Sequence, residues 1–432
     1  MNQKHGIAVL AGARTPFCKA FTELRDVSAV ELGCSALTDA LRRARLQPSD
    51  IDEVVFGNVS GPPDAANIGR VIALKSGLPH DRVAHTVNRN CASGMESIIA
   101  AWQAIGSGRA ATVVAGGTES MSNVPLLVGR KASEIWLQLA RAKTISQRLR
   151  LMSQFRPRHF KPVAGIELGL TDPVSGLNMG QTAEVLANEF GISRQQQDQF
   201  AVESHRNAET AQTDCFLSGE IVPLKRDDGT IVKRDNGIRY GQSLEQLGRL
   251  KPIFEKEGTV TAGNSCQLTD GAAALVLKAA DQVDPSTDSP LGYIRDYAIA
   301  GCDPRRMGLG PVYATSKLLQ QTGLQLTDFG LFEINEAFAA QVLACMRAME
   351  SNEFAANELD RTQPLGRIAA DRLNIHGGAI ALGHPVGTTG TRLILTLLRS
   401  LKAAGHRRGL ATLCVGGGQG VAMIVETEGE TK

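Results

Sequence analysis

One order of elements occurs twice in this chain, and this repetition restricts the possible folds more than any other feature of the sequence. Residues 49–58, SDIDEVVFGN, align in register with residues 327–336, TDFGLFEINE, at an offset of 278. Residues 90–117 and 383–418 then share a turn of small residues, a helical pattern, a glycine, an apolar run and a glycine pair. Because recurrent spacing is typical of duplicated structural units, the sequence predicts two homologous halves.

Strand-like and helix-like segments alternate within both halves. Residues 27–46 and 91–106 carry apolar side chains at the three- and four-residue spacing of an amphipathic helix. This alternation predicts an α/β fold with a partly parallel sheet. Strands are expected at 6–12, 52–59, 111–117, 273–277, 332–336, 411–417 and 421–426.

The halves are separated by a long irregular insertion. We expect the first half to comprise residues 1–125 and a returning segment, 251–284, and the second half to comprise 285–432. The intervening residues, 126–250, contain polar pieces with proline and glycine. Insertions of this length in a compact fold are usually functional, so a role in ligand or partner binding is expected here.

Residues 130–161 are the most basic part of the insertion. Glu134 is their single acid, and apolar residues recur at steps of three and four. The apolar positions are Ile135, Leu139, Ala142, Ile145, Leu149 and Met152. The basic positions are Arg130, Lys131, Arg141, Lys143, Arg148, Arg150, Arg156, Arg158 and Lys161. Such a basic amphipathic segment is consistent with a helix covering its own subunit, a membrane surface, a partner protein or a ligand phosphate.

The composition argues against several functions. Lys and Arg number 46 against 44 Asp and Glu, and aromatic residues are only 4%, which argues against a nucleic-acid partner. No apolar stretch is long enough for a membrane span, and the N-terminal run is too short for a signal peptide. The eight cysteines include no CxxC pair, which argues against a zinc ribbon and a disulfide framework. We therefore expect a cytoplasmic protein.

Cys91 is the first candidate for chemistry. It lies between a strand-like segment and a helical pattern, in VNRNCASGMES. A helix N-terminus lowers the pKa of a thiol and offers backbone N–H groups to a negatively charged oxygen. Cys91 is therefore a candidate nucleophile, although a small buried hydrophobic residue is the alternative interpretation.

Three further positions have constrained settings at the ends of strands or in tight loops. His384 lies between a glycine and a proline, where an imidazole can take a proton from a neighbouring thiol, and the alternative is a histidine of a surface loop. Cys414 ends a strand before three glycines, and it is alternatively a buried strand residue. Asn335 and Glu336 end another strand: Asn335 could orient a water and Glu336 could support His384, or both could simply cap the next helix.

Six motifs resemble the thiolase family, in order and across nearly the whole chain. They are VNRNCASGMES, GGTESMS, GTVTAGNSCQLTDGAAAL, NEAFAAQ, GGAIALGHPVGTTG and CVGGGQG. The segments DNGIRYGQSLEQLGRLKPIF and LGPVYATSKLL are most similar to the β subunit of the fatty-acid β-oxidation complex. The resemblance implies the thiolase fold, in which two five-stranded halves form α-β-α-β-α layers and an inserted loop domain covers coenzyme A.

The resemblance also implies catalytic roles. Cys91 would be acylated, His384 would activate it, and Cys414 would be the second acid and base. His384 and a water held by Asn335 would form one oxyanion hole, and the N–H groups of Cys91 and Gly416 would form the other. The implied reaction is thiolysis of 3-ketoacyl-CoA by CoA in fatty-acid β-oxidation, with CoA as a substrate and no metal or other cofactor.

Further implications concern CoA and the partners. Arg239, Ser265, Cys266 and Met179 would contact CoA, although many family members have serine at the position of Cys266. We expect a homodimer or a dimer of dimers, with a hydratase/dehydrogenase α subunit or a membrane surface as a partner of residues 130–161. A biosynthetic acetoacetyl-CoA thiolase is the nearest alternative, and a non-catalytic acyl-CoA-binding subunit is the alternative from another class.

Overall fold

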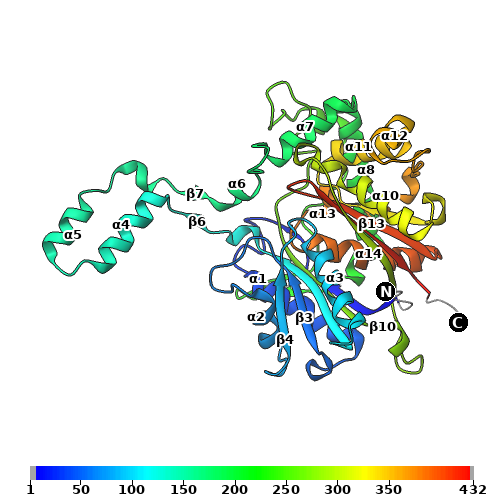
Figure 1. Ribbon diagram of the computed structural model, residues 1–432, viewed down its shortest axis with the longest axis horizontal. Helices are drawn as coiled ribbons and strands as arrows, with labels where there is room; N and C mark the ends of the chain where they lie inside the picture. The colour runs from blue at the N-terminus through cyan, green and yellow to red at the C-terminus, as the bar shows by residue number, and fades with distance from the viewer. Residues whose placement is uncertain (1–5, 429–432) are drawn as a thin grey trace. The chain divides into compact units, whose positions relative to one another are not determined.

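The computed structural model describes residues 6–428 (Figure 1). The strands are β1 (Ile7–Arg14), β2 (Cys18–Lys19), β3 (Glu53–Gly57), β4 (Val83–Val87), β5 (Thr112–Glu119), β6 (Leu126–Leu127), β7 (Val163–Ala164), β8 (Leu224–Lys225), β9 (Ile231–Val232), β10 (Thr269–Ala279), β11 (Gly292–Gly301), β12 (Leu331–Ile334), β13 (Arg408–Val415) and β14 (Gln419–Glu426). The helices are α1 (Ala29–Ala44), α2 (Ile68–Lys75), α3 (Ser93–Gly106), α4 (Arg130–Arg141), α5 (Ile145–Met152), α6 (Gly165–Gly169), α7 (Met179–Glu189), α8 (Arg194–Thr213), α9 (Leu244–Gly248), α10 (Gly310–Thr322), α11 (Ala339–Glu350), α12 (Asn352–Glu358), α13 (Ala379–Leu382) and α14 (Thr389–Ala404). The predicted α/β class is confirmed.

The main sheet is mixed and combines both halves. Its order is β12-β13-β14-β11-β1-β10-β5-β3-β4, and β2 pairs with β10 outside this path. The halves join where β1 and β11 pair antiparallel, with Ile7 opposite Ile294. Strand β3 is parallel to β4 and β5, and β12 is parallel to β13. The second half has four named strands in this sheet, and a parallel bridge between Phe332 and Leu373 occupies the edge beyond β12.

The repeated sequence segments have the same local structure. A short 3-10 turn precedes β3 at Pro48–Asp50, and another precedes β12 at Leu326–Asp328. Each begins at a glutamine whose backbone N–H donates to the aspartate three residues later, at 2.8 Å in both cases. The duplication read from residues 49–58 and 327–336 therefore extends to individual hydrogen bonds.

Five layers result from the packing of the helices on the sheet. Helices α1 and α2 cover the first half on the outside, and α10 and α11 cover the second half. Helices α3 and α14 lie between the halves, and they share one core with strands of both (Figure 1). The two central helices approach closely at glycines, since a Cβ on Gly94 would lie 2.7 Å from the backbone nitrogen of Thr391. This contact brings the N-termini of α3 and α14 together, which positions the candidate site.

The sequence missed three strands of the main sheet, β2, β4 and β11. Strand β2 has only two residues, and β4 and β11 are largely half-buried, with polar side chains between their apolar residues. The strands that were expected are buried along most of their length and read as continuous apolar runs.

Residues Val124–Thr171 form a separate compact unit. The apolar residues at three- and four-residue steps do not lie on one helix. Helix α4 ends at Arg141, and α5 begins after Thr144, which caps it through a capping box with Gln147. These apolar residues are largely exposed on α5: Ile145 is 78% exposed and Leu149 is 62% exposed. The predicted boundaries of the insertion and of the halves stay a prediction.

Two negative observations concern residues 6–428. No helix in this range is long and apolar enough to cross a membrane. No cluster of three or more histidine, cysteine or acidic side chains in the same range is arranged to hold a metal ion.

Candidate active site

Cys91 lies in the loop between β4 and α3, two residues before the helix begins. Its neighbours fasten this loop to the second half of the chain. Asn90 has a positive φ of 44°, and its side-chain amide donates to the carbonyl oxygen of Gly416 at 2.8 Å. Arg89 donates to the side chain of Gln419 at 2.8 Å. The thiol is thus placed by contacts between segments more than 300 residues apart in sequence.

Backbone donors converge on the thiol of Cys91. Burial raises the pKa of the Cys91 thiol, while hydrogen bonds from the backbone N–H groups of Gly416 and of Cys91 itself act in the opposite direction. Two N–H groups directed at one atom are the arrangement that stabilises a negatively charged oxygen in acyl transfer. The role of the N–H groups of Cys91 and Gly416 as an oxyanion hole stays a prediction.

Cys414 and Cys266 lie near Cys91. Burial raises the pKa of Cys414 well above its usual range, and the proximity of Cys91 is the second cause. Burial raises the pKa of Cys266 to about 12, again with Cys91 as the second cause. Both thiols therefore remain protonated at neutral pH, which is the state required of an acid that donates a proton.

The side chain of His384 is held in one tautomer. It is 6% exposed, and its Nδ1 lies 2.6 Å from Oγ1 of Thr389. The Thr389 hydroxyl donates to the carbonyl oxygen of Pro385 at 3.1 Å, so its oxygen accepts the proton of Nδ1. Nε2 therefore carries the lone pair, and it has no hydrogen-bond partner among residues 6–428. Burial, and then the charge of Arg392, lowers the pKa of His384 to about 4, so the ring is neutral at pH 7.

Asn335 has a buried amide that is not paired within the described part of the chain. The residue is fully buried, yet neither Nδ2 nor Oδ1 forms a hydrogen bond with any group of residues 6–428. Buried amides rarely remain unpaired, so this side chain requires a water or a ligand group. The alternative that Asn335 caps the next helix is wrong, because Phe338 is the N-cap of α11.

Glu336 supports the loop that carries His384. Its carboxylate accepts hydrogen bonds from the hydroxyl of Ser204 at 2.6 Å and from the amide of Asn374 at 2.8 Å. It also accepts the backbone N–H of Ile380, in α13, at 3.2 Å. Since His384 follows α13 by two residues, Glu336 links the end of β12 to the histidine loop.

The four residues predicted to contact CoA have different settings. Met179 borders the glycine turn after Cys414, since its sulfur would lie 3.1 Å from a Cβ on Gly416. Ser265 is buried and donates to the carbonyl oxygen of Thr261 at 2.7 Å, and Cys266 is near Cys91 as described. Arg239 is exposed on a turn outside this cluster of residues.

Sequence reasoning missed an aromatic pair beside these residues. Phe254 and Phe338 meet edge to face with ring centroids 6.0 Å apart. A Cβ on Gly180, the neighbour of Met179, would lie 2.2 Å from the ring of Phe254. Phe338 follows Asn335 by three residues, so the pair forms an apolar border next to the polar residues. Both phenylalanines stand inside motifs quoted above, but only the structure brings them together.

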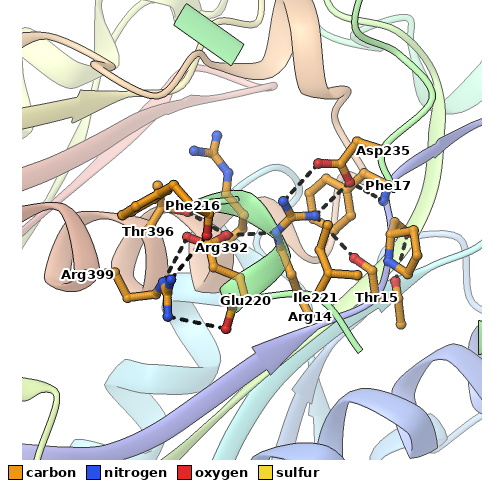
Figure 2. Close-up of polar contacts among 12 residues, drawn as sticks. Arg14, Thr15, Phe17, Phe216, Glu220, Ile221, Asp235, Arg392, Thr396 and Arg399 are labelled. Atoms are coloured by element: carbon orange, nitrogen blue, oxygen red, sulfur yellow. Dashed lines mark hydrogen bonds and ion pairs between the residues drawn. The ribbon is translucent and has the colours of Figure 1, made fainter. Parts of the chain in front are cut away.

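Figure 2 shows a buried ion-pair network around Arg14 and Glu220. Arg14 is fully buried and pairs with Asp235 at 2.7 Å and with Glu220 at 2.8 Å. Arg399 approaches the other oxygen of Glu220 at 3.6 Å. The network joins the end of β1 to the segment that precedes Arg239, because Asp235 also accepts the backbone N–H of Phe17 at 2.7 Å. Its components are dispersed in sequence, and no short motif indicated it.

Comparisons with known proteins agree with this geometry. The model of the thiolase N-terminal domain matches residues 7–281, and the model of the thiolase C-terminal domain matches residues 288–427. A 3-ketoacyl-CoA thiolase of Yersinia enterocolitica is 39% identical over 98% of this chain and 97% of its own length. The mitochondrial trifunctional enzyme subunit beta of Bos taurus is 40% identical over 97% of this chain and 88% of its own length.

Solved structures of thiolases have the same fold. Human mitochondrial 3-ketoacyl-CoA thiolase in complex with CoA superimposes with a TM-score of 0.84 at 34% identity, and 98% of each chain is covered. Acetyl-CoA acetyltransferase of Bacillus anthracis superimposes with a TM-score of 0.86 at 34% identity, over 99% of this chain and 100% of that one. The two domain models, the relatives and the shared fold lead to one conclusion: the chain belongs to the thiolase family.

Proposed function

We propose that this protein is a 3-ketoacyl-CoA thiolase, which cleaves 3-ketoacyl-CoA with CoA to acetyl-CoA and an acyl-CoA two carbons shorter. The observation that carries the proposal is the state of His384: its ring is neutral, its tautomer is fixed, and Nε2 has no hydrogen-bond partner among residues 6–428. The names of the relatives from Yersinia enterocolitica and Bos taurus support an acyltransferase of fatty-acid β-oxidation.

In the first step, His384 takes the proton of the Cys91 thiol, and the sulfur attacks the 3-keto carbon of the substrate. The carbonyl oxygen becomes negative and is stabilised by the N–H groups of Cys91 and Gly416. The carbon–carbon bond then breaks, and acetyl-CoA leaves as an enolate that takes a proton from Cys414. The shortened acyl group remains on Cys91 as a thioester.

In the second step, deprotonated Cys414 removes the proton from the thiol of a new CoA, whose sulfur attacks the thioester on Cys91. The bond between the acyl group and Cys91 breaks, and His384 returns its proton to the Cys91 sulfur. The amide of Asn335 has two unpaired polar atoms, so it is suited to hold the water that stabilises the enolate oxygen together with His384. We assign CoA contacts to Arg239, Ser265, Cys266 and Met179. In this proposal CoA is a substrate, and no metal or other cofactor takes part.

Thiolysis is the direct test. Free CoA is supplied with 3-ketoacyl-CoA of short, medium and long chain, and substrate loss is followed for the wild type and for Cys91→Ala. Turnover that grows with chain length and disappears in Cys91→Ala is expected. Cys34→Ala, which removes a half-buried thiol of α1, is the matched control and should retain full activity.

Other outcomes would favour the alternatives. Turnover confined to acetoacetyl-CoA would indicate a biosynthetic enzyme, a reading that the likeness to acetyl-CoA acetyltransferase supports. CoA binding without turnover, also in the presence of a hydratase/dehydrogenase subunit, would indicate a non-catalytic acyl-CoA-binding protein.

We also propose the assembly in which the enzyme works. Strand β4 is the outer strand of the main sheet, so its free edge can pair with a second copy in a homodimer or a dimer of dimers. The relative named as a beta subunit supports a hydratase/dehydrogenase α subunit as a partner. The exposed surface of residues 130–161 is our candidate for that contact or for a peripheral membrane contact. All eight cysteines are free, which is consistent with a cytoplasmic compartment.

A further inference from the structure

Helix α8 fastens the turn that carries Arg239. The backbone N–H of Arg239 donates to Nδ1 of His205 at 3.2 Å, and the backbone N–H of Gly241 donates to the carboxylate of Glu209 at 3.0 Å. His205 and Glu209 are four residues apart, so they lie on one face of the helix. The turn is thus held at two points, one on each side of Tyr240.

The anchored turn presents its side chains outward. Arg239 is exposed and Tyr240 is 58% exposed, whereas His205 is 2% exposed. Gly241 has a φ of 65°, which lets the chain reverse directly after these two residues. The side chain of Arg239 therefore starts from a fixed backbone, and less conformational entropy is lost when it binds a ligand.

His205 is suited to a permanent acceptor role. Nδ1 must be unprotonated to accept the N–H of Arg239. Burial, and then the positive charge of Arg239, lowers the pKa of His205 to about 4, so the ring stays neutral at physiological pH. Its function is therefore to hold the backbone and not to exchange protons with substrate.

We propose that His205 and Glu209 are positioning residues that hold the Arg239 turn where the guanidinium meets a phosphate of CoA. They would set the affinity for the nucleotide end of CoA without influencing the chemistry at Cys91. This inference rests on the proposed function, because it assumes that Arg239 contacts CoA.

The test separates the nucleotide from the reacting thiol. Thiolysis is measured with CoA and with pantetheine, which carries the same thiol but neither nucleotide nor phosphate, for His205→Leu, His205→Asn, Glu209→Ala and Arg239→Ala. In His205→Leu the KM for CoA should rise about five- to tenfold, since one buried hydrogen bond is lost. The kcat and the KM for pantetheine should not change.

The remaining variants test whether the hydrogen bonds to His205 and Glu209 act through Arg239. His205→Asn places an amide oxygen near the position of Nδ1, so it should restore most of the affinity. Glu209→Ala alters a half-buried residue and should raise the KM for CoA less than His205→Leu does. Combining His205→Leu with Arg239→Ala should raise the KM no further than Arg239→Ala alone, because both act through one contact.

Three results would overturn the inference. The first is an equal loss of affinity for CoA and pantetheine, and the second is a His205→Asn variant as impaired as His205→Leu. The third is an Arg239→Ala variant with an unchanged KM for CoA. Failure of the proposed function would give a result distinct from these three, because the wild type would then lack thiolysis altogether. In that case, calorimetric binding of CoA to the same variants would still test the positioning role. If His205→Leu does not fold, Glu209→Ala carries the comparison.

Discussion

At the residue scale, Thr389 decides which nitrogen of His384 can act as a base. Its hydroxyl accepts from Nδ1 and donates to Pro385, so the free lone pair is on Nε2. Thr389→Val removes this acceptor and retains the side-chain volume. We expect kcat for thiolysis to fall on the order of 10- to 100-fold, because the tautomer and the ring orientation are no longer fixed.

The control for this prediction is Thr389→Ser, which keeps the hydroxyl and should retain most of the activity. Both variants should bind CoA with normal affinity, as measured by calorimetry. A Thr389→Val enzyme with unchanged kcat would show that His384 does not depend on this hydrogen bond.

Two buried histidines should make stability depend on pH. The pKa values of His384 and His205 are each lowered from about 6.5 to about 4. Between pH 4 and pH 6.5 the unfolded chain binds protons at these two histidines that the folded chain does not. The free energy of unfolding therefore decreases as the pH falls below 6.5. Each histidine should remove about 2 kcal/mol from the free energy of unfolding by pH 5.

Other groups titrate in the same pH range. Burial raises the pKa of Glu333 to about 7, so its contribution to the free energy of unfolding increases as the pH falls. The measurement therefore compares the wild type with His205→Asn by denaturant unfolding at pH 7 and pH 5. The variant should lose about 2 kcal/mol less between these values. Equal losses in the two proteins would contradict a neutral buried His205.

The sequence indicated candidate reacting residues but not those that orient them. Cys91, His384 and Cys414 stand in short motifs beside glycines or a helix start, so local patterns made them candidates, and the resemblance to the thiolase family implied their roles. Thr389 stands in one of the same motifs, but its role depends on a hydrogen bond to the histidine five residues earlier. Arg14 and Asp235 are 221 residues apart, and a contact over this separation is created only by folding.

At the element scale, the crossing of α3 and α14 needs small residues. A Cβ on Gly94 would lie 2.7 Å from the backbone nitrogen of Thr391, and a Cβ on Gly390 would lie 2.4 Å from that of Met95. Gly94→Ala should therefore separate the helices and lower the free energy of unfolding by about 1–3 kcal/mol. Thiolysis should decrease as well, because both Cys91 and His384 lie just before these helices.

Gly248→Ala is the matched control, since a Cβ at this position at the end of α9 meets no atom within 4 Å. It should change neither the denaturant midpoint nor kcat. If Gly94→Ala were as stable as this control, the close helix contact would not limit the packing of the central layer.

Sequence patterns predicted the strands whose residues are buried along nearly their whole length. β5 and β14 are buried almost throughout, so they appeared as apolar runs. β4 and β11 are partly exposed, and their polar residues hid them. The 3.6-residue period continued across residues 142–144, although Thr144 starts a new helix there. Periodicity alone does not detect a break when the capping residue retains the spacing.

At the scale of the whole molecule, the unit Val124–Thr171 exposes apolar and basic side chains together. Trp136 packs against Phe155 at 5.2 Å, and Phe155 packs against Phe160 at 5.1 Å, so the unit has a small aromatic cluster of its own. Even so, Trp136 remains 54% exposed, and Phe160 remains 58% exposed. Exposed aromatic and aliphatic surface of this kind is typical of contact sites.

The charges of this unit give the last prediction. The substitutions are Arg148→Gln, Arg150→Gln, Arg156→Gln and Arg158→Gln, combined in one variant; all four arginines are exposed. Neutralising them should weaken binding to vesicles that contain anionic lipids, or co-purification with a hydratase/dehydrogenase subunit, on the order of 100- to 1,000-fold, because each of the four removes an attractive charge of roughly 1 kcal/mol. Thiolysis of a short 3-ketoacyl-CoA should be unchanged, because no reacting group lies in this unit.

The control neutralises four exposed basic residues of the larger unit: Lys75, Arg305, Arg367 and Arg407. It makes the same change in net charge, so a general electrostatic effect would weaken binding equally in both variants. Selective loss in the first variant would assign the contact to Val124–Thr171, and the salt dependence of the residual binding would separate charge from apolar contact. Unchanged binding in both the vesicle and the co-purification assay would exclude the arginines as the contact, whatever covers the apolar side chains of the unit.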